Sequence, residues 1–130
     1  MVRIAKHAAE NNKVVCMNMS APFLCTFFKE PMLQMLPYVD YWFGNETEAD
    51  EFAKVNEFGV NGQVKEYPVV TIKSEDIVDS NGAGDSFVGG FLSQLVQGKP
   101  LEECIRCGHH TANIVLQRTG CSLPEKPTFV

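Results

Sequence analysis

The sequence has few basic residues, no long apolar run and no dense set of cysteines. Eleven Lys and Arg against sixteen Asp and Glu give the 130 residues a formal net charge of −5. This acidic balance disfavours nucleic acid and anionic membranes as principal partners. No run approaches the roughly 20 apolar residues that span a bilayer, and charged residues interrupt the N-terminal segment where a signal peptide has its apolar core. We therefore expect an intracellular protein with neither a membrane nor a nucleic-acid partner.

The cysteines are too sparse, and odd in number, for a disulfide-stapled secreted domain: Cys16, Cys25, Cys104, Cys107 and Cys121. Cys104 and Cys107 form a C-x-x-C spacing, but inside a predicted helix and without a second pair. Two reduced helix thiols are therefore favoured over a zinc or redox pair. His109 and His110 also lack a third ligand at metal spacing, which disfavours zinc.

Length and a 45% hydrophobic content predict one domain over residues 1–130. Apolar periodicity predicts helices over residues 2–10, 23–28, 32–36, 47–54, 87–95 and 101–117, and strands over 14–17, 38–43 and 68–72. Residues 56–67 are polar, contain glycine and predict a loop. Strands that alternate with helices indicate an α/β layered fold with a mostly parallel sheet flanked by helices.

The most unusual stretch precedes the predicted helix at 87–95 and reads Asp79-Ser80-Asn81-Gly82-Ala83-Gly84-Asp85. Gly82 and Gly84 lack a Cβ atom, so the backbone can turn sharply and approach a ligand. Amides at a helix start point toward one spot, which favours a phosphate. Asp85 lies among these donors, where a general base for phosphoryl transfer would be placed. The plainer alternative is an ordinary helix start that Asp85 caps, and a glycine-rich loop alone does not decide between them.

Residues 79–91 resemble the C-terminal signature of the ribokinase-like, or PfkB, family of carbohydrate and nucleoside kinases. Residues 44–48, Gly-Asn-Glu-Thr-Glu, resemble the Asn-x-x-Glu motif of the same family. Segments 18–23, 107–112 and 118–127 are similar to its adenosine kinase branch. The resemblance covers nearly the whole chain, and it implies a partial ribokinase-like fold.

The resemblance implies ATP-dependent phosphorylation of adenosine at its 5′-hydroxyl, which gives AMP and ADP. Adenosine and ATP are then the expected partners. The resemblance also implies the roles of the matching residues. Asp85 is expected to take the hydroxyl proton, and the amides of Asn81, Gly82, Ala83 and Gly84 are expected to form an anion hole.

The remaining site residues also come from the resemblance. Asn45 and Glu48 are expected to hold Mg²⁺ and phosphate, largely through water. Asp79 and Asn81, with the turn at 119–122, are expected near a monovalent cation, K⁺, and His109 beside the base of ATP. The plainer alternatives are that Asn45 is only a helix cap and Glu48 a solvated first-turn acid.

The sequence also departs from the family. Its first half, with a second glycine motif, the acid that binds the ribose hydroxyls and the lid, is not seen. Asn45 and Asp85 are 40 residues apart, fewer than in adenosine kinases. We therefore expect a partial domain with an internal deletion, its loop at 56–67 marking a shortened interval.

Three functional hypotheses remain from the sequence. The first is an adenosine kinase or an active portion of one, and the second is a non-catalytic fragment that binds nucleotide or associates with another chain. The third is another sugar kinase of the family. Family members are usually monomeric, whereas a fragment is expected to self-associate. The expected location is the cytoplasm, with the nucleus as a second site.

Overall fold

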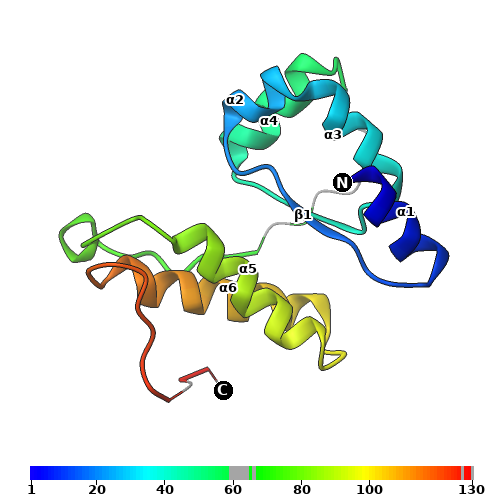
Figure 1. Cartoon of the computed structure of the whole chain (residues 1–130). Helices are drawn as coiled ribbons and strands as arrows, with labels where there is room; N and C mark the ends of the chain where they lie inside the picture. Colours follow the sequence, from blue (N-terminus) through cyan, green and yellow to red (C-terminus); the bar gives the residue numbers. More distant parts are fainter. Residues whose placement is uncertain (59–64, 66, 127, 130) are drawn as a thin grey trace. The chain divides into compact units, whose positions relative to one another are not determined.

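The computed structural model describes residues 1–58, 65, 67–126 and 128–129 (Figure 1). The chain divides into two compact units, Met1–Gln63 and Val64–Val130, which are described separately. The single domain over residues 1–130 stays a prediction. Much of the loop expected at 56–67 lies outside the described residues, namely 59–64 and 66.

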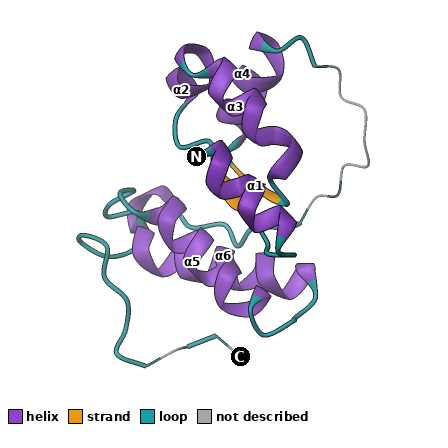
Figure 2. Cartoon of the chain, turned by 45° about the vertical axis from the view of Figure 1, so that its right-hand side comes forward, coloured by secondary structure: helices purple, strands orange, loops and turns teal. Residues whose placement is uncertain are grey.

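The first unit contains a short parallel sheet and the helices around it. Its elements in order are α1 (Val2–Glu10), β1 (Cys16–Asn18), α2 (Pro22–Phe27), α3 (Lys29–Met35), the 3-10 turn η1 (Leu36–Tyr38), β2 (Tyr41–Phe43) and α4 (Glu46–Val55). Strands β1 and β2 pair in parallel, with Met17 opposite Trp42. Parallel neighbours need a crossover, which α2 and α3 supply (Figure 2).

The core of this unit lies between the sheet and its helices. Cys25, Met32 and Phe52 form the buried cluster. Trp42 of β2 packs against it, and its ring centroid is 4.9 Å from that of Phe52. The predicted strand at 38–43 is shorter in the structure, because η1, which contains Pro37, occupies the segment before β2.

The second unit is built on two long helices that lie side by side (Figures 1 and 2). Its elements are the 3-10 turn η2 (Ser74–Asp76), α5 (Ala83–Leu95) and α6 (Leu101–Leu116). Two glycines allow the helices to approach closely. A Cβ atom on Gly90 would lie 2.7 Å from the carbonyl oxygen of Cys107, and one on Gly108 would lie 2.8 Å from the Phe87 ring.

The strand predicted at residues 68–72 is wrong. These residues are irregular, and Val69 and Val70 are 60% and 70% exposed. A strand needs a neighbour for its ladder of hydrogen bonds, and the sheet in the described residues consists of β1 and β2. The Val70 carbonyl instead accepts a hydrogen bond of 3.3 Å from the Asn113 side chain.

The helix expected over 87–95 begins earlier, at Ala83. The glycine-rich segment is therefore not a loop throughout, since its second half forms the first turn of α5. None of the helices in the described part of the chain has the length and apolar character needed to cross a lipid bilayer.

Candidate active site

The start of α5 exposes a turn of helical backbone without a side-chain cap. Gly82 precedes the helix with φ +78°, in the left-handed region that favours glycine. Ala83, Gly84 and Asp85 then form the first turn, whose amides have no preceding turn to bond. The first intrahelical bond follows at once, because the Ser86 amide donates to the Gly82 carbonyl at 2.9 Å. This arrangement gives a helix N-terminus suited to an anion.

The two loop glycines have different surroundings. A Cβ atom on Gly82 would lie 2.8 Å from the Cys121 sulfur, so the close contact requires glycine there. A Cβ atom on Gly84 would meet nothing within 4 Å, which leaves the first turn open to a ligand. The Asp85 side chain is exposed beside it.

Asp79 ties the loop to the segment after α6. Its Oδ1 accepts a hydrogen bond of 2.9 Å from the Asn81 amide, and its Oδ2 accepts one of 3.2 Å from the Gly120 amide. These two hydrogen bonds lower the pKa of Asp79 below its usual value of 3.8, and the bond from the Asn81 amide has the larger effect. The structure thus links Asp79 to the turn at 119–122 and to the Asn81 amide. The cation site itself stays a prediction.

The predicted anion hole is only partly open in this geometry. The Asn81 amide already donates to Asp79, and the Ala83 amide makes a long bond of 3.4 Å to the Ser80 carbonyl. Gly82 and Gly84 remain the amides best placed for a ligand. The anion hole of residues 81–84 and the role of Asp85 stay predictions.

Asn45 and Glu48 form a reciprocal capping box at the start of α4. Asn45 Oδ1 accepts from the Glu48 amide at 2.9 Å, while the Asn45 amide and Asn45 Nδ2 donate to Glu48 Oε2 at 3.1 Å and Oε1 at 3.2 Å. The Glu48 residue is only 7% exposed. The interpretation of Glu48 as a solvated acid is therefore wrong, and Asn45 is a helix cap whatever else it binds.

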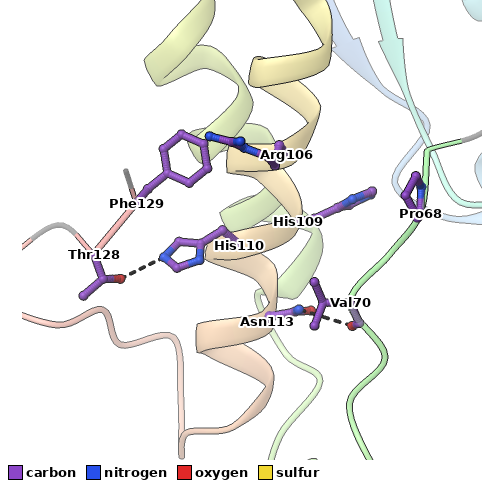
Figure 3. A pocket seen from close by; sticks show the side chains of 8 residues that line it. All are labelled: Pro68, Val70, Arg106, His109, His110, Asn113, Thr128 and Phe129. Carbon is purple, nitrogen blue, oxygen red and sulfur yellow. Dashed lines mark hydrogen bonds between the residues drawn. The ribbon is translucent and has the colours of Figure 1, made fainter.

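His109 lies on α6 at a cavity of about 440 Å³. Its ring centroid is 5.3 Å from that of Phe87, and burial lowers the pKa of His109. Figure 3 shows its ring pointing toward Pro68. The other lining residues are Val70, Arg106, His110, Asn113, Thr128 and Phe129.

The wall of this cavity opposite Pro68 is aromatic and cationic. His110 Nε2 is hydrogen-bonded to Thr128 Oγ1 at 2.8 Å, and the Arg106 guanidinium lies 5.0 Å from the centre of the Phe129 ring (Figure 3). A planar ring with polar edges matches these surroundings. Arg106, His110 and Asn113 lie on α6 with His109, whereas the other walls come from segments outside that helix. Only His109 was expected to contact a ligand here, because local sequence patterns do not show which segments meet.

No group of three or more His, Cys, Asp and Glu side chains in the described residues could hold a metal. Cys104 and Cys107 are buried in α6 as free thiols, and burial raises the pKa of Cys104. The site also contains Thr111, which had no sequence-based role, and Cys121, a member of the expected turn at 119–122. Thr111 contacts the first turn of α5, and Cys121 contacts Gly82.

Comparison with known proteins identifies relatives of this chain. It is 45% identical to adenosine kinase 1 of Arabidopsis thaliana over 163 aligned residues, which cover 97% of this chain and 47% of that protein. The chain therefore spans about half the length of the curated relatives it matches. The alignment is longer than the 130 residues of the chain, so that relative has residues with no counterpart here.

Solved structures agree with the predicted partial ribokinase-like α/β fold. Anopheles gambiae adenosine kinase, in complex with P1,P4-di(adenosine-5) tetraphosphate, superposes with a TM-score of 0.90 at 35% identity, over 98% of this chain and 49% of that one. Schistosoma mansoni adenosine kinase, in complex with 2-fluoroadenosine, gives 0.89 at 27% identity, over 95% of this chain and 48% of that one.

The family match comes in two stretches. Residues 1–62 and 58–128 each match the family described as pfkB family carbohydrate kinase. The two stretches meet at residues 58–62, inside the interval that the sequence analysis identified as shortened. Because the matches cover almost the whole sequence, the chain belongs to the pfkB family of carbohydrate kinases.

Proposed function

We propose that this chain carries the phosphate-binding and catalytic half of an adenosine kinase, which transfers the γ-phosphoryl group of ATP to the 5′-hydroxyl of adenosine. The observation that carries the proposal is the open first turn of α5, with the exposed Asp85 beside it. The names of the relatives supply the nucleoside, since the matched proteins are adenosine kinases.

In the proposed reaction, Asp85 accepts the proton of the attacking hydroxyl. The amides of Gly82 and Gly84 stabilise the charge on the transferring group, and those of Asn81 and Ala83 would join them on leaving their bonds to Asp79 and Ser80. One such donor is worth about 3 kcal/mol of barrier, and a positioned base adds roughly 10² to 10⁴ in rate. Loss of Asp85 should therefore reduce the rate more than loss of any contact to the base of ATP.

The pair at the start of α4 fits a water-mediated Mg²⁺ site. Both Glu48 carboxylate oxygens already accept a hydrogen bond from Asn45, yet each retains a lone pair for an ordered water. Magnesium usually keeps several waters and is held by few carboxylates. When bound, the ion would neutralise phosphate charge. Glu48 and Asn45 would orient its waters, and the reciprocal cap holds both side chains in place.

Two further assignments belong to the same proposal. The Asp79 carboxylate, fixed by the Asn81 and Gly120 amides, would offer its remaining lone pairs to K⁺. The cavity beside His109 would take the base of ATP. Burial lowers the pKa of His109, which favours the uncharged ring and suits it to stacking.

Association with another chain is a second candidate function, favoured by exposed aromatic side chains on α2. Phe23 and Phe27 are 59% and 79% exposed and lie on one side of the helix, because they are four residues apart. Exposed apolar groups of this size often mark an interface. This candidate predicts a change in oligomeric state, or thermal stabilisation by ATP, without turnover.

The test is chromatographic detection of AMP from ATP, Mg²⁺ and adenosine. The folded chain is compared with Asp85→Asn and with Asp76→Asn, which makes the same charge change in η2 of the same unit. We expect AMP from the wild type and from Asp76→Asn, and a loss of roughly 10² to 10⁴ with Asp85→Asn. Ribose and fructose should not compete with adenosine. A folded sample that makes no AMP removes the kinase proposal for this chain.

A further inference from the structure

The hydroxyl of Thr111, on α6, lies against the backbone of α5 immediately after Asp85. Thr111 Oγ1 is 2.6 Å from the Ser86 carbonyl oxygen, a contact between residues 25 positions apart. It is also 3.1 Å from the Cys107 carbonyl and 3.0 Å from the Gly108 carbonyl of its own helix. We propose that Thr111 is a positioning residue, which holds the first turn of α5 and thereby aims Asp85.

A threonine hydroxyl has one proton to donate, and all three neighbours are acceptors. The contact with the Ser86 carbonyl is the shortest of the three, so we take that carbonyl as the main acceptor. The two contacts within α6 are those that threonine makes in any helix. The bond to Ser86 is different, because it joins two helices.

The short contact depends on a glycine in the facing helix. A Cβ atom on Gly90 would lie 2.3 Å from Thr111 Oγ1, so only glycine at position 90 leaves room for the hydroxyl. Ser86 itself is buried, and its amide donates back to the Gly82 carbonyl. Thr111 therefore bonds the one turn that contains Gly82 at one end and Asp85 near the other.

This geometry fixes the rotation of α5 about its axis at the turn that bears Asp85. A displacement of about 1 Å at a reacting group can cost 10²-fold in rate. Thr111 would thus affect the reaction without contacting the substrate. The kinetic part of this inference rests on the proposed function of Asp85, whereas the tether between the helices does not.

The structural test is amide hydrogen exchange on three variants of the 130-residue chain. Thr111→Val removes the hydroxyl and keeps the branched shape, and Thr111→Ser keeps the hydroxyl. Ser93→Ala removes a hydroxyl that donates to the Gly90 carbonyl at 2.7 Å and lies 3.7 Å from the Cys107 sulfur of α6, away from the first turn of α5. We expect Thr111→Val to speed exchange at the Ser86 and Phe87 amides about tenfold, the size of one lost hydrogen bond. Thr111→Ser should restore protection, and Ser93→Ala should leave these two amides unchanged.

The kinetic test uses the same variants in the AMP assay. Thr111→Val should lower kcat about tenfold or more while KM for ATP and adenosine stays constant, and Thr111→Ser should recover most of it. In an Asp85→Asn background, Thr111→Val should cause no further loss, because it acts through Asp85.

Two results would overturn the inference. The first is unchanged exchange at Ser86 and Phe87 in Thr111→Val, which would show that no tether exists. The second is a loss of kcat that persists undiminished in the Asp85→Asn background, which would show that Thr111 does not act through Asp85. Absence of AMP from the wild type would instead refute the proposed function, and the exchange data would still decide the tether.

Discussion

Replacing Gly82 with alanine tests the geometry of the turn before α5. At φ +78°, an L-residue adopts a left-handed conformation that costs about 1–2 kcal/mol. The new Cβ atom would also lie 2.8 Å from the sulfur and 3.0 Å from the Cβ atom of Cys121. Overpacking of this kind typically costs about 1–3 kcal/mol. Gly82→Ala should therefore destabilise the second unit by about 2–5 kcal/mol.

Gly98 provides a matched control in the same unit. Its φ is +70°, yet a Cβ atom there would meet nothing within 4 Å. Gly98→Ala should thus cost only the backbone part, about 1–2 kcal/mol. Adding Cys121→Ala to Gly82→Ala removes the sulfur contact but leaves the Cβ contact, so it should restore part of the loss.

The assay is urea unfolding, with stability read from the midpoint at unchanged slope. Thermal melting gives a second reading, since 1 kcal/mol shifts Tm by about 4–8 °C in a domain of 60–100 residues. Equal losses for Gly82→Ala and Gly98→Ala would refute the reasoning, because only the contact with Cys121 distinguishes the two sites.

Three other predictions follow from the contacts described above. Asn45→Ala should destabilise the first unit by about 1 kcal/mol in urea unfolding. Asn45→Ser can still cap α4, so its free energy of unfolding should fall little. Equal losses of stability for the two variants would contradict the capping box. The pKa of Asp79 is lower in the folded chain than its usual value of 3.8. The ionised carboxylate therefore stabilises the fold above pH 3.8, and this contribution to stability is lost as the pH falls through the folded pKa. Asp79→Asn should lack this acid-dependent part in pH-dependent unfolding, and a curve that parallels the wild type would be evidence against the two amide bonds. Cys121 is exposed and Cys104 is buried, so a thiol reagent should modify Cys121 first. ATP should slow the modification of Cys121, and adenosine should not. A modification rate that ATP leaves unchanged would show that the nucleotide does not cover Gly82.

Local sequence signals predicted the helices well. Residues 2–10 are helical as expected, because apolar and charged residues alternate at helical spacing and two asparagines follow. Asn45 caps the start of α4, in agreement with its interpretation as a helix cap. Gly82 precedes a helix in the left-handed conformation that only glycine adopts without strain. Each of these features depends on neighbours within one turn.

Features that depend on distant partners were not predictable in the same way. The β-branched residues at 69–72 form a strand only when another strand lies beside them, and the sheet in the described residues consists of β1 and β2. The contact between Thr111 and Ser86 joins two helices beside a glycine, and no sequence pattern predicts that these two residues meet. The cavity beside His109 also combines segments that are far apart in the chain.

The phosphate site at the start of α5 can be tested most directly by NMR. Uniformly ¹⁵N-labelled chain is titrated with ATP and Mg²⁺, and separately with adenosine, while the backbone amides are followed. ATP should move the Gly84 and Asp85 amide resonances more than those at the far end of α5, and adenosine alone should not. If ATP shifts other resonances but leaves these two amides in place, the first turn of α5 is not where the phosphate binds.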